Sequence, residues 1–299
     1  MTQPLLIIVN GAHARKNQEK LNVSFGRLQK ANVAFHVIET TQPGHARLLA
    51  KEAFDKGQRN FVAAGGDGTS FEIINGLFPA ATREPVSLGF LPLGTGNSFV
   101  RDFSDQAERY SIEAIIRGRK KAVDVAVLSC KEGELYFINI LSLGLVAHIG
   151  RLRNRYFSCL GHVGYSVATL LRSLGSKSFP LAIETEETRD KPFPTELMFA
   201  SFCNSRYTGG DMLMAPAAKL DDGRIDVITS TPMDAEALLR SFPQIFKGTH
   251  VEHPSIRYFN TANLRFIDAP KQAIMIDGEI LDVTPLSLRM LPGALTVLL

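Results

Sequence analysis

The chain has 299 residues, 45% hydrophobic and 21% charged, so it can bury a substantial core and does not have the composition of a disordered tail. Its formal net charge of +3 requires no nucleic-acid partner, although it is compatible with a mild attraction to anionic lipid or polyphosphate. The three cysteines are widely spaced, which indicates core thiols in a reducing compartment and no disulfide framework.

The N-terminus predicts no targeting segment. The apolar run Leu5–Val9 is too short for a signal peptide, and no apolar run in the sequence is long enough to cross a bilayer. We therefore expect a cytoplasmic protein without a transmembrane segment.

The first 122 residues predict alternating strands and helices with short connections. Strands are expected over residues 5–9, 33–38, 61–64 and 86–91, and helices over residues 21–28, 45–56, 70–77 and 107–117. A basic polar loop is expected from His13 to Lys20, and Gly57 and Gly118 are expected to end helices. This alternation is typical of a Rossmann-like α/β lobe whose parallel sheet is covered by helices on both faces.

A strand over residues 61–64 runs directly into the glycine turn Gly65-Gly66-Asp67-Gly68-Thr69. Glycines leave room for the backbone to turn sharply or to approach a ligand closely. Thr69 and Glu72 have the spacing of a capping box, which predicts a helix start at Thr69. A strand, a glycine turn and a helix N-terminus together favour binding of a phosphate.

Asp67 is the exceptional residue of this turn, because a carboxylate repels a phosphate unless a cation lies between them. We therefore expect a nucleotide phosphate together with Mg²⁺. The alternative is a tight turn in which Asp67 only caps backbone groups.

The next strand ends in a second glycine loop, Pro92-Leu93-Gly94-Thr95-Gly96-Asn97-Ser98. Both loops would lie at the carboxyl ends of sheet strands, where open α/β sheets bind ligands. Neither loop has the Walker pattern, and neither has Gly-x-Gly-x-x-Gly in the first βαβ unit, which disfavours a dinucleotide oxidoreductase.

From about residue 123 the hydrophobic pattern changes to period two. Strands are expected over residues 123–127, 135–140, 197–203, 224–229, 264–267 and 273–276. Two helical pieces, at 161–174 and 234–246, interrupt them. The pattern predicts an antiparallel β-sandwich over residues 123–299, joined to the α/β domain 1–122 without a flexible linker, and leaves open whether the extreme C-terminus returns to the first lobe. A direct junction favours an active site in a cleft between the lobes.

The two glycine loops together resemble the diacylglycerol kinase catalytic family, which includes bacterial lipid kinases and sphingosine and ceramide kinases. The first loop alone is shared with NAD kinases and phosphofructokinases. The resemblance continues through Asp124, the stretch Phe137-Ile138-Asn139-Ile140 with Gly144, Leu220-Asp221-Asp222-Gly223 and Ile276-Asp277-Gly278-Glu279. It implies a nucleotide lobe, a β-sandwich lobe for the lipid, and transfer of the ATP γ-phosphate to a lipid hydroxyl.

The resemblance also implies roles for single residues. The ATP-binding set would be Asn10, Thr40, Gly65, Gly66, Asp67, Gly68, Thr69, Glu72, Gly94, Thr95 and Asn97. Asp67 and Asp124 would form an acidic network around a catalytic Mg²⁺. Asp277 would be the general base, and Glu279 would assist it. Asp222 and the main-chain carbonyls of Lys219 and Arg224 resemble a second, structural Mg²⁺ site.

Local sequence offers a simpler interpretation of two of these motifs, because Asp277-Gly278 and Asp221-Asp222-Gly223 are also typical hairpin turns. The chain departs from the family pattern at Ser98, where bacterial lipid kinases usually carry Asp, and this puts the metal shell and the substrate class in doubt. The stretch from Arg151 to Leu160 is basic and apolar, so it suggests either a membrane-facing segment or a solvated helix face.

The sequence therefore predicts an ATP- and Mg²⁺-dependent kinase that phosphorylates a membrane lipid, with no nucleic-acid partner, in the cytoplasm or peripherally at the inner membrane surface. The alternatives are a kinase for NAD or a small polyol, and a catalytically weak nucleotide-binding regulatory protein. The identity of the lipid and the formation of a homodimer stay open.

Overall fold

The computed structural model describes residues 3–94, 97–156, 178–186 and 193–299. The chain forms two compact units, one of residues 1–124 with 293–299 and the other of residues 125–292. The chain passes from one unit to the other within strands β5 (Lys120–Cys130) and β18 (Pro285–Leu298). None of the described helices is long and apolar enough to span a membrane.

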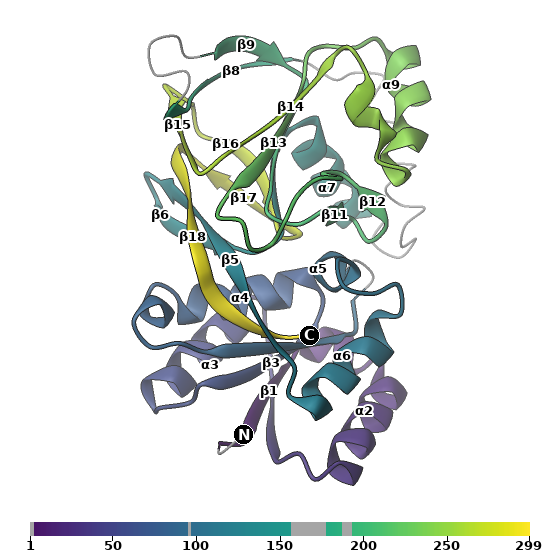
Figure 1. Cartoon of the computed structure of the whole chain (residues 1–299), viewed down its shortest axis with the longest axis vertical. Coiled ribbons are helices and arrows are strands. Elements are labelled where there is room, and N and C mark those ends of the chain that lie inside the picture. The colour runs from purple at the N-terminus through teal and green to yellow at the C-terminus, as the bar shows by residue number, and fades with distance from the viewer. Residues whose placement is uncertain (1–2, 95–96, 157–177, 187–192) are drawn as a thin grey trace. The chain divides into compact units, whose positions relative to one another are not determined.

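The first unit is built on a parallel sheet in the order β2-β1-β3-β4-β18 (Figure 1). Its strands are β1 (Leu5–Val9), β2 (Phe35–Glu39), β3 (Asn60–Gly65), β4 (Ser87–Pro92) and the end of β18. Its helices are α1 (Gly11–Ala14), α2 (Gln18–Lys30), α3 (His45–Asp55), α4 (Asp67–Leu77), η1 (Ala80–Thr82), α5 (Ser98–Arg101) and α6 (Ala107–Arg117). The predicted α/β lobe is confirmed.

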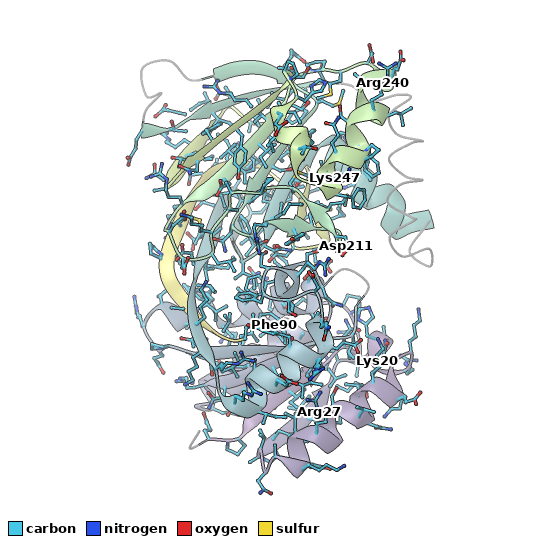
Figure 2. All side chains as sticks on the ribbon, turned by 45° about the vertical axis from the view of Figure 1, so that its right-hand side comes forward. Lys20, Arg27, Phe90, Asp211, Arg240 and Lys247 are labelled. Carbon is cyan, nitrogen blue, oxygen red and sulfur yellow. The ribbon has the colours of Figure 1, made fainter. Side chains whose placement is uncertain are left out.

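Alternate strand residues bury opposite faces of this sheet. Leu5, Ile7 and Val9 of β1 pack in one cluster with Leu28 of α2 and Ile115 of α6. The other face lies against α3 and α4, which also contact each other. Figure 2 shows Phe90 of β4 inside this unit, whereas Lys20 of α2 extends outward.

The second unit contains two sheets, one of them in the antiparallel order β14-β13-β10-β7-β16-β17. The other has β15 antiparallel to both β18 and β8, with β9 beside β8 and the hairpin β5–β6. Phe202 of β10 and Phe266 of β15 are buried with ring centroids 5.4 Å apart, so the two sheets share a core. This confirms the predicted β-sandwich.

The elements of the second unit, besides β5 and β18, have the following bounds. The strands are β6 (Gly133–Phe137), β7 (Ile140–Gly144), β8 (Phe179–Glu184), β9 (Phe193–Leu197), β10 (Phe199–Cys203), β11 (Tyr207–Thr208), β12 (Met212–Leu213), β13 (Ile225–Ser230), β14 (Ile256–Thr261), β15 (Asn263–Ile267), β16 (Gln272–Ile276) and β17 (Glu279–Val283). The helices are α7 (Leu145–Tyr156), α9 (Ala235–Ser241), η4 (Phe242–Phe246) and η5 (Thr249–Glu252). The helix expected at 161–174 lies outside the described residues.

Two local predictions were wrong, and one strand was not predicted. The segment from His13 to Lys20, expected to be a loop, contains the end of α1 and the start of α2. The Asn10 side chain caps α1, and α2 buries an apolar face. Helix α4 begins at Asp67, so Thr69 is not its N-cap and no capping box forms. The final strand β18 was not expected as one 14-residue element, because its apolar residues do not alternate regularly.

Candidate active site

The two glycine loops meet at the carboxyl ends of β3 and β4. Gly65 lies opposite Pro92 in the parallel register, and the carbonyl of Gly65 accepts hydrogen bonds from the N–H groups of Leu93 (2.9 Å) and Gly94 (3.3 Å). A Cβ added at Gly94 would lie 2.6 Å from the Cα of Gly66, which is closer than real Cβ contacts come. The absence of side chains is therefore what allows the two backbones to touch.

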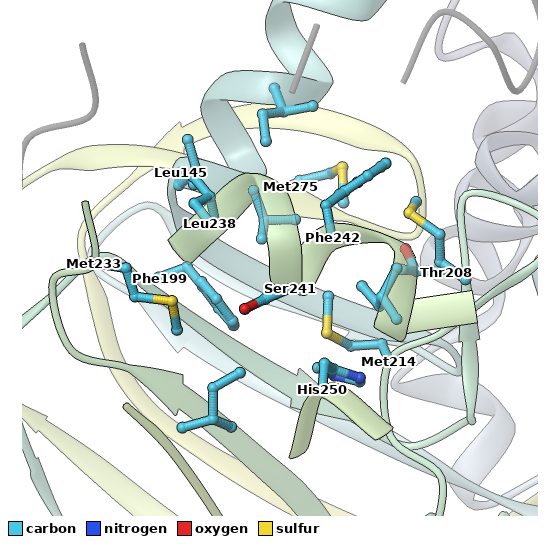
Figure 3. A pocket seen from close by; sticks show the side chains of 15 residues that line it. Leu145, Phe199, Thr208, Met214, Met233, Leu238, Ser241, Phe242, His250 and Met275 are labelled. Carbon is cyan, nitrogen blue, oxygen red and sulfur yellow. The ribbon is translucent and has the colours of Figure 1, made fainter. Parts of the chain in front are cut away.

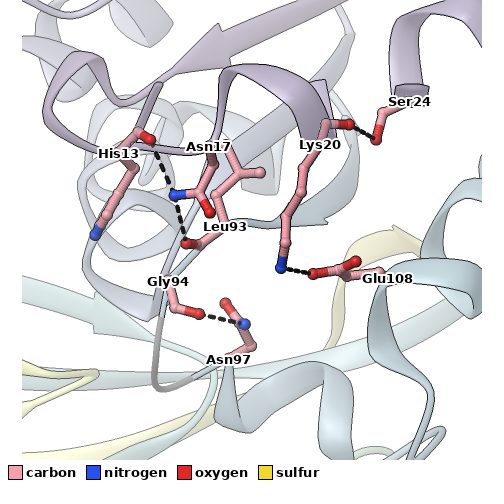
Figure 4. Close-up of polar contacts among 8 residues, drawn as sticks. All are labelled: His13, Asn17, Lys20, Ser24, Leu93, Gly94, Asn97 and Glu108. Carbon is pink, nitrogen blue, oxygen red and sulfur yellow. Dashed lines mark hydrogen bonds and ion pairs between the residues drawn. The ribbon is translucent and has the colours of Figure 1, made fainter. Parts of the chain in front are cut away.

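The second loop is also tied to the start of the chain (Figure 4). The Asn97 amide donates to the Gly94 carbonyl at 2.7 Å, which closes the loop on itself. The Asn17 amide donates to the carbonyls of Leu93 (3.3 Å) and His13 (3.0 Å). Asn17 was not among the predicted site residues, because nothing in its local pattern distinguishes it from a surface asparagine. Thr95 lies outside the described residues.

Asp67 lies at the start of α4 and is held by the second loop. Its carboxylate accepts hydrogen bonds from the backbone N–H groups of Ser98 (3.0 Å) and Phe99 (3.5 Å). Burial raises the pKa of Asp67 to about 6, and the hydrogen bonds from Ser98 and Phe99 oppose that rise. The ionised form is thus disfavoured here, and a nearby cation would relieve that penalty.

Ser98 faces this carboxylate. Besides its N–H group, its side-chain hydroxyl hydrogen-bonds to Asp67. An aspartate at this position, as in the resembling family, would add a second negative charge. Ser98 instead supplies a neutral donor, so the site carries one charge fewer while the orientation of Asp67 is preserved.

Other predicted nucleotide residues hold the loops in place. Asn10 caps α1 through its side-chain oxygen, and its amide donates to the Thr69 hydroxyl at 3.2 Å. The Thr40 hydroxyl accepts from the N–H group of Gly11 at 3.2 Å. Asn10, Thr69 and Thr40 thus connect the carboxyl ends of β1, β2 and β3, next to the first glycine loop.

Glu72 has a different place from the one its spacing suggested. Its two carboxylate oxygens accept from the N–H groups of Gly44 (2.8 Å) and Ala46 (3.0 Å), at the start of α3. Glu72 therefore caps α3 and not its own helix, which satisfies N–H groups that a helix start leaves unpaired.

Asp124 is buried in β5, and its carboxylate accepts from the N–H group of Gly293 at 2.7 Å. This bond joins two segments of the first unit that lie far apart in sequence. Among the described residues, no group of three or more histidine, cysteine, aspartate or glutamate side chains is arranged to hold a metal ion. The acidic network of Asp67 and Asp124 stays a prediction.

Asp277 occupies the turn between β16 and β17, with a positive φ of 44°. Its buried carboxylate accepts from three consecutive backbone N–H groups, those of Ile138 (3.1 Å), Asn139 (3.1 Å) and Ile140 (2.9 Å). Asp277 is therefore both the hairpin residue that local sequence indicated and an anchor for the chain between β6 and β7. Glu279, at the start of β17, is exposed.

The predicted structural metal site is also a turn. The Asp222 carboxylate accepts from the N–H group of Arg224 at 3.0 Å, and the Arg224 guanidinium bonds to Asn260 at 2.7 Å. Nearby Asp226 is buried in β13, and its pKa is raised to about 6, chiefly by burial and further by the charge of Asp222. The role of Lys219, Asp222 and Arg224 stays a prediction.

The residues present fit the groups that the sequence implied. The first glycine loop offers an approach to backbone without side chains at a helix N-terminus, which suits a phosphate. Asp67 offers a carboxylate whose ionised form a divalent cation would favour.

Two family descriptions match this chain. The family description "Diacylglycerol kinase catalytic domain" matches residues 4–128, and "YegS C-terminal NAD kinase beta sandwich-like domain" matches residues 139–299. A diacylglycerol kinase of Mycobacterium tuberculosis is 26% identical over 85% of this chain and 81% of its own. The "Probable lipid kinase YegS-like" of Chromohalobacter salexigens is 26% identical over 97% of this chain and 91% of its own.

A solved structure shares the fold. The crystal structure of a diacylglycerol kinase from Bacillus anthracis str. Sterne superposes with a TM-score of 0.72 and 24% identity, over 99% of this chain and 96% of that one.

The contact between the glycine loops predicts a steric effect of Gly94→Ala. The added methyl group must displace the Gly66 backbone, so we expect the free energy of unfolding to fall by about 1–3 kcal/mol in urea titrations. Gly26→Ala is the matched control, because a Cβ at Gly26 in α2 meets nothing within 4 Å. That variant should be neutral or more stable by up to about 1 kcal/mol. Equal effects of the two substitutions would contradict the contact.

The raised pKa of Asp67 predicts a pH-dependent stability of the metal-free protein. The folded state binds the proton more tightly than the unfolded state, so Asp67 lowers stability progressively as pH rises from about 4 to about 6. Asp67→Asn should therefore gain stability relative to the parent over that range, on the order of 3 kcal/mol, and stay level above it.

Urea unfolding with EDTA at a series of pH values measures this difference. Asp105→Asn removes an exposed carboxylate of the same unit and should leave the pH dependence unchanged. A constant difference between Asp67→Asn and the parent from pH 4 to 7 would refute the burial of this charge.

The hydrogen bonds of Asp277 predict that Asp277→Asn destabilises the protein. An amide can keep the bonds from Asn139 and Ile140 but presents N–H to the N–H of Ile138, which costs about 1–3 kcal/mol. The exposed control Glu279→Gln should change the free energy of unfolding by less than about 0.5 kcal/mol. Unchanged stability of Asp277→Asn would exclude the anchoring role.

Proposed function

Because this chain belongs to the family that joins a diacylglycerol kinase catalytic domain to a YegS-type β-sandwich domain, we propose that it transfers the ATP γ-phosphate to a hydroxyl group of a membrane lipid. The observation that carries the proposal is the contact of the two glycine loops around Asp67. Diacylglycerol is the first substrate to test, since matching relatives bear the name diacylglycerol kinase.

The first unit supplies what phosphoryl transfer requires of a nucleotide site. Phosphoryl transfer depends mainly on positioning and on neutralising phosphate charge. The N-terminus of α4 and the glycine backbones of Gly65, Gly66 and Gly94 would receive the phosphates. Thr95 and Asn97 would border the nucleotide, and Mg²⁺, when bound, would neutralise phosphate oxygens next to Asp67.

The second unit would supply the proton acceptor. A lipid alcohol needs a base within hydrogen-bonding reach as its oxygen attacks phosphorus. We assign this task to Asp277, as the resemblance implies, with Glu279 assisting. The three N–H donors on Asp277 fix its orientation, but they also use much of its accepting capacity, so Glu279 is the competing candidate.

The proposal is tested by incubating the protein with γ-labelled ATP, Mg²⁺ and diacylglycerol in mixed micelles. Label should appear in an organic-phase product whose mass corresponds to a phosphorylated lipid. Asp67→Asn should lower kcat/KM at least about 100-fold, because it removes charge from the metal shell, while Asp105→Asn stays within about two-fold. Asp277→Asn, assayed where it is folded, should retain ATP binding and lose most turnover.

The alternatives give different results in the same assay. A labelled product that stays in the aqueous phase would favour a kinase for NAD or a polyol. ATP binding without any labelled product would favour a regulatory nucleotide-binding protein. Unchanged turnover in Asp277→Asn, with loss in Glu279→Gln, would transfer the role of the base to Glu279.

A further inference from the structure

Strand β2 is the free edge of the parallel sheet in the first unit. It pairs with β1 on one side, and no described strand pairs with it on the other. A hollow of about 380 Å³ lies beside this edge, between β2 and α3, and is open to solvent. It differs from the cavity of about 80 Å³ in the second unit, which apolar side chains such as Leu145 and Phe199 line (Figure 3). The edge of β2 is therefore accessible to a partner.

The backbone of β2 presents unpaired polar groups along this edge. In a parallel pair, successive residues point their backbone groups alternately toward the neighbouring strand and away from it. The N–H of Thr40 donates to the carbonyl of Val9 at 2.8 Å, which fixes the phase, so Phe35, Val37 and Glu39 point away from β1. The N–H and C=O groups of these three residues have no hydrogen-bond partner among the described residues.

Apolar side chains are exposed along the same edge. Val37 and Ile38 of β2 are 44% and 38% exposed, and Leu48 of the adjacent α3 is 55% exposed. Natural sheets commonly protect a free edge with lysine or proline, and β2, of sequence FHVIE, contains neither. An edge of this kind is protected when another strand pairs with it.

We propose that a second copy of this chain covers the edge, with the two β2 strands antiparallel across a two-fold axis at Val37. A two-fold interface uses the same surface of both copies. This register pairs Val37 with Val37 of the second copy, and Phe35 with Glu39 of the second copy. Each of the three outward-facing residues then exchanges both of its backbone hydrogen bonds. Other antiparallel registers leave at least one of the three without a partner in the strand.

The side chains of β2 are compatible with this pairing. Successive residues of a strand point to opposite faces of the sheet, and residues directly opposite each other in an antiparallel pair are in contact. On one face, Val37 meets Val37 of the second copy at the axis. On the other face, which carries α3, Ile38 lies opposite His36 of the second copy. The exposed apolar side chains of the edge thus become covered.

The charges beside the edge favour a second copy over other partners. Within α3, Lys51 and Asp55 pair with each other at 2.7 Å. Glu52 and Lys56, which line the hollow, make no ion pair among the described residues. A two-fold axis reverses the order of these charges in the second copy, so Lys56 of each copy faces Glu52 of the other. The surface is therefore complementary to itself in charge as well as in hydrogen bonding.

Val37→Lys tests the interface by sedimentation equilibrium. Two lysines would meet at the axis, whereas in a single copy the lysine extends into solvent. We expect the parent to dimerise and the dissociation constant of the dimer to rise at least about 100-fold in Val37→Lys. Val23→Lys is the matched control, because Val23 of α2 is 58% exposed, and it should change the constant by less than about two-fold.

Hydrogen exchange of single backbone amides tests the register. The N–H of Val37 gains a partner only in the dimer, so it should exchange at least about ten-fold more slowly at a protein concentration above the dissociation constant than below it. The N–H of Ile38 faces β1 and is bonded in both states, so it serves as the internal control. Its exchange should be slow at both concentrations.

Charge reversal tests the role of Glu52 and Lys56. Glu52→Lys and Lys56→Glu should each weaken dimerisation about three-fold to ten-fold, because each places like charges opposite one another twice across the axis. The double variant exchanges the two charges and should restore most of the affinity. A double variant no tighter than either single variant would remove this ion pair from the interface.

A parent that stays monomeric at every protein concentration would overturn the proposal, and so would a Val37→Lys variant that dimerises as tightly as the parent. Exchange of the Val37 N–H that is independent of protein concentration would exclude pairing of the β2 strands. Thermal unfolding confirms that each variant is folded. None of these measurements needs a nucleotide or a lipid, so the result is independent of the proposed kinase activity.

Discussion

The site depends on one close contact between backbones, that of the first glycine loop with the second. The Gly65 carbonyl accepts two N–H groups of the second loop, and Gly66 and Gly94 approach so closely that no side chain fits between them. Adjacent parallel strands bring the two loops to the same edge of the sheet, and the glycines remove the steric barrier to their contact. Once the loops touch, the N–H groups of Ser98 and Phe99 lie within reach of Asp67.

That contact has an electrostatic consequence. Asp67 is drawn into a partly buried position where its charge is poorly solvated, and the hydrogen-bond donors Ser98 and Phe99 of the short helix α5 oppose that penalty. Ser98 adds no negative charge beside Asp67, whereas a second carboxylate at this position would repel the first when no cation is bound. The replacement of aspartate by serine is therefore compatible with a retained role for Asp67 and with fewer acidic ligands for a metal.

Sequence patterns predicted those features that depend on neighbours in the chain. Hydrophobic periodicity predicted the parallel sheet, the bounds of α6 and the change from alternating strands and helices to successive strands near residue 123. Glycine spacing predicted both loops. Hydrogen bonds between residues far apart in sequence could not be predicted from local patterns. Glu72 has a capping-box spacing to Thr69 but caps α3, 26 residues away at Ala46. Asp277 looks like an ordinary hairpin residue, yet its partners are 137 to 139 positions earlier.

Buried polar side chains of this protein fall into two kinds. Some accept several hydrogen bonds and stabilise the fold, whereas others stay energetically unfavourable and are candidates for binding a ligand. Glu72 and Asp277 each accept several backbone N–H groups, so their removal should harm the fold whatever their further role. Asp67 also accepts the N–H groups of Ser98 and Phe99, but burial still raises its pKa to about 6, so its charged form stays disfavoured. Such a cost persists in a marginally stable protein when a ligand repays it. A cation beside Asp67 would do so, as the proposed function requires.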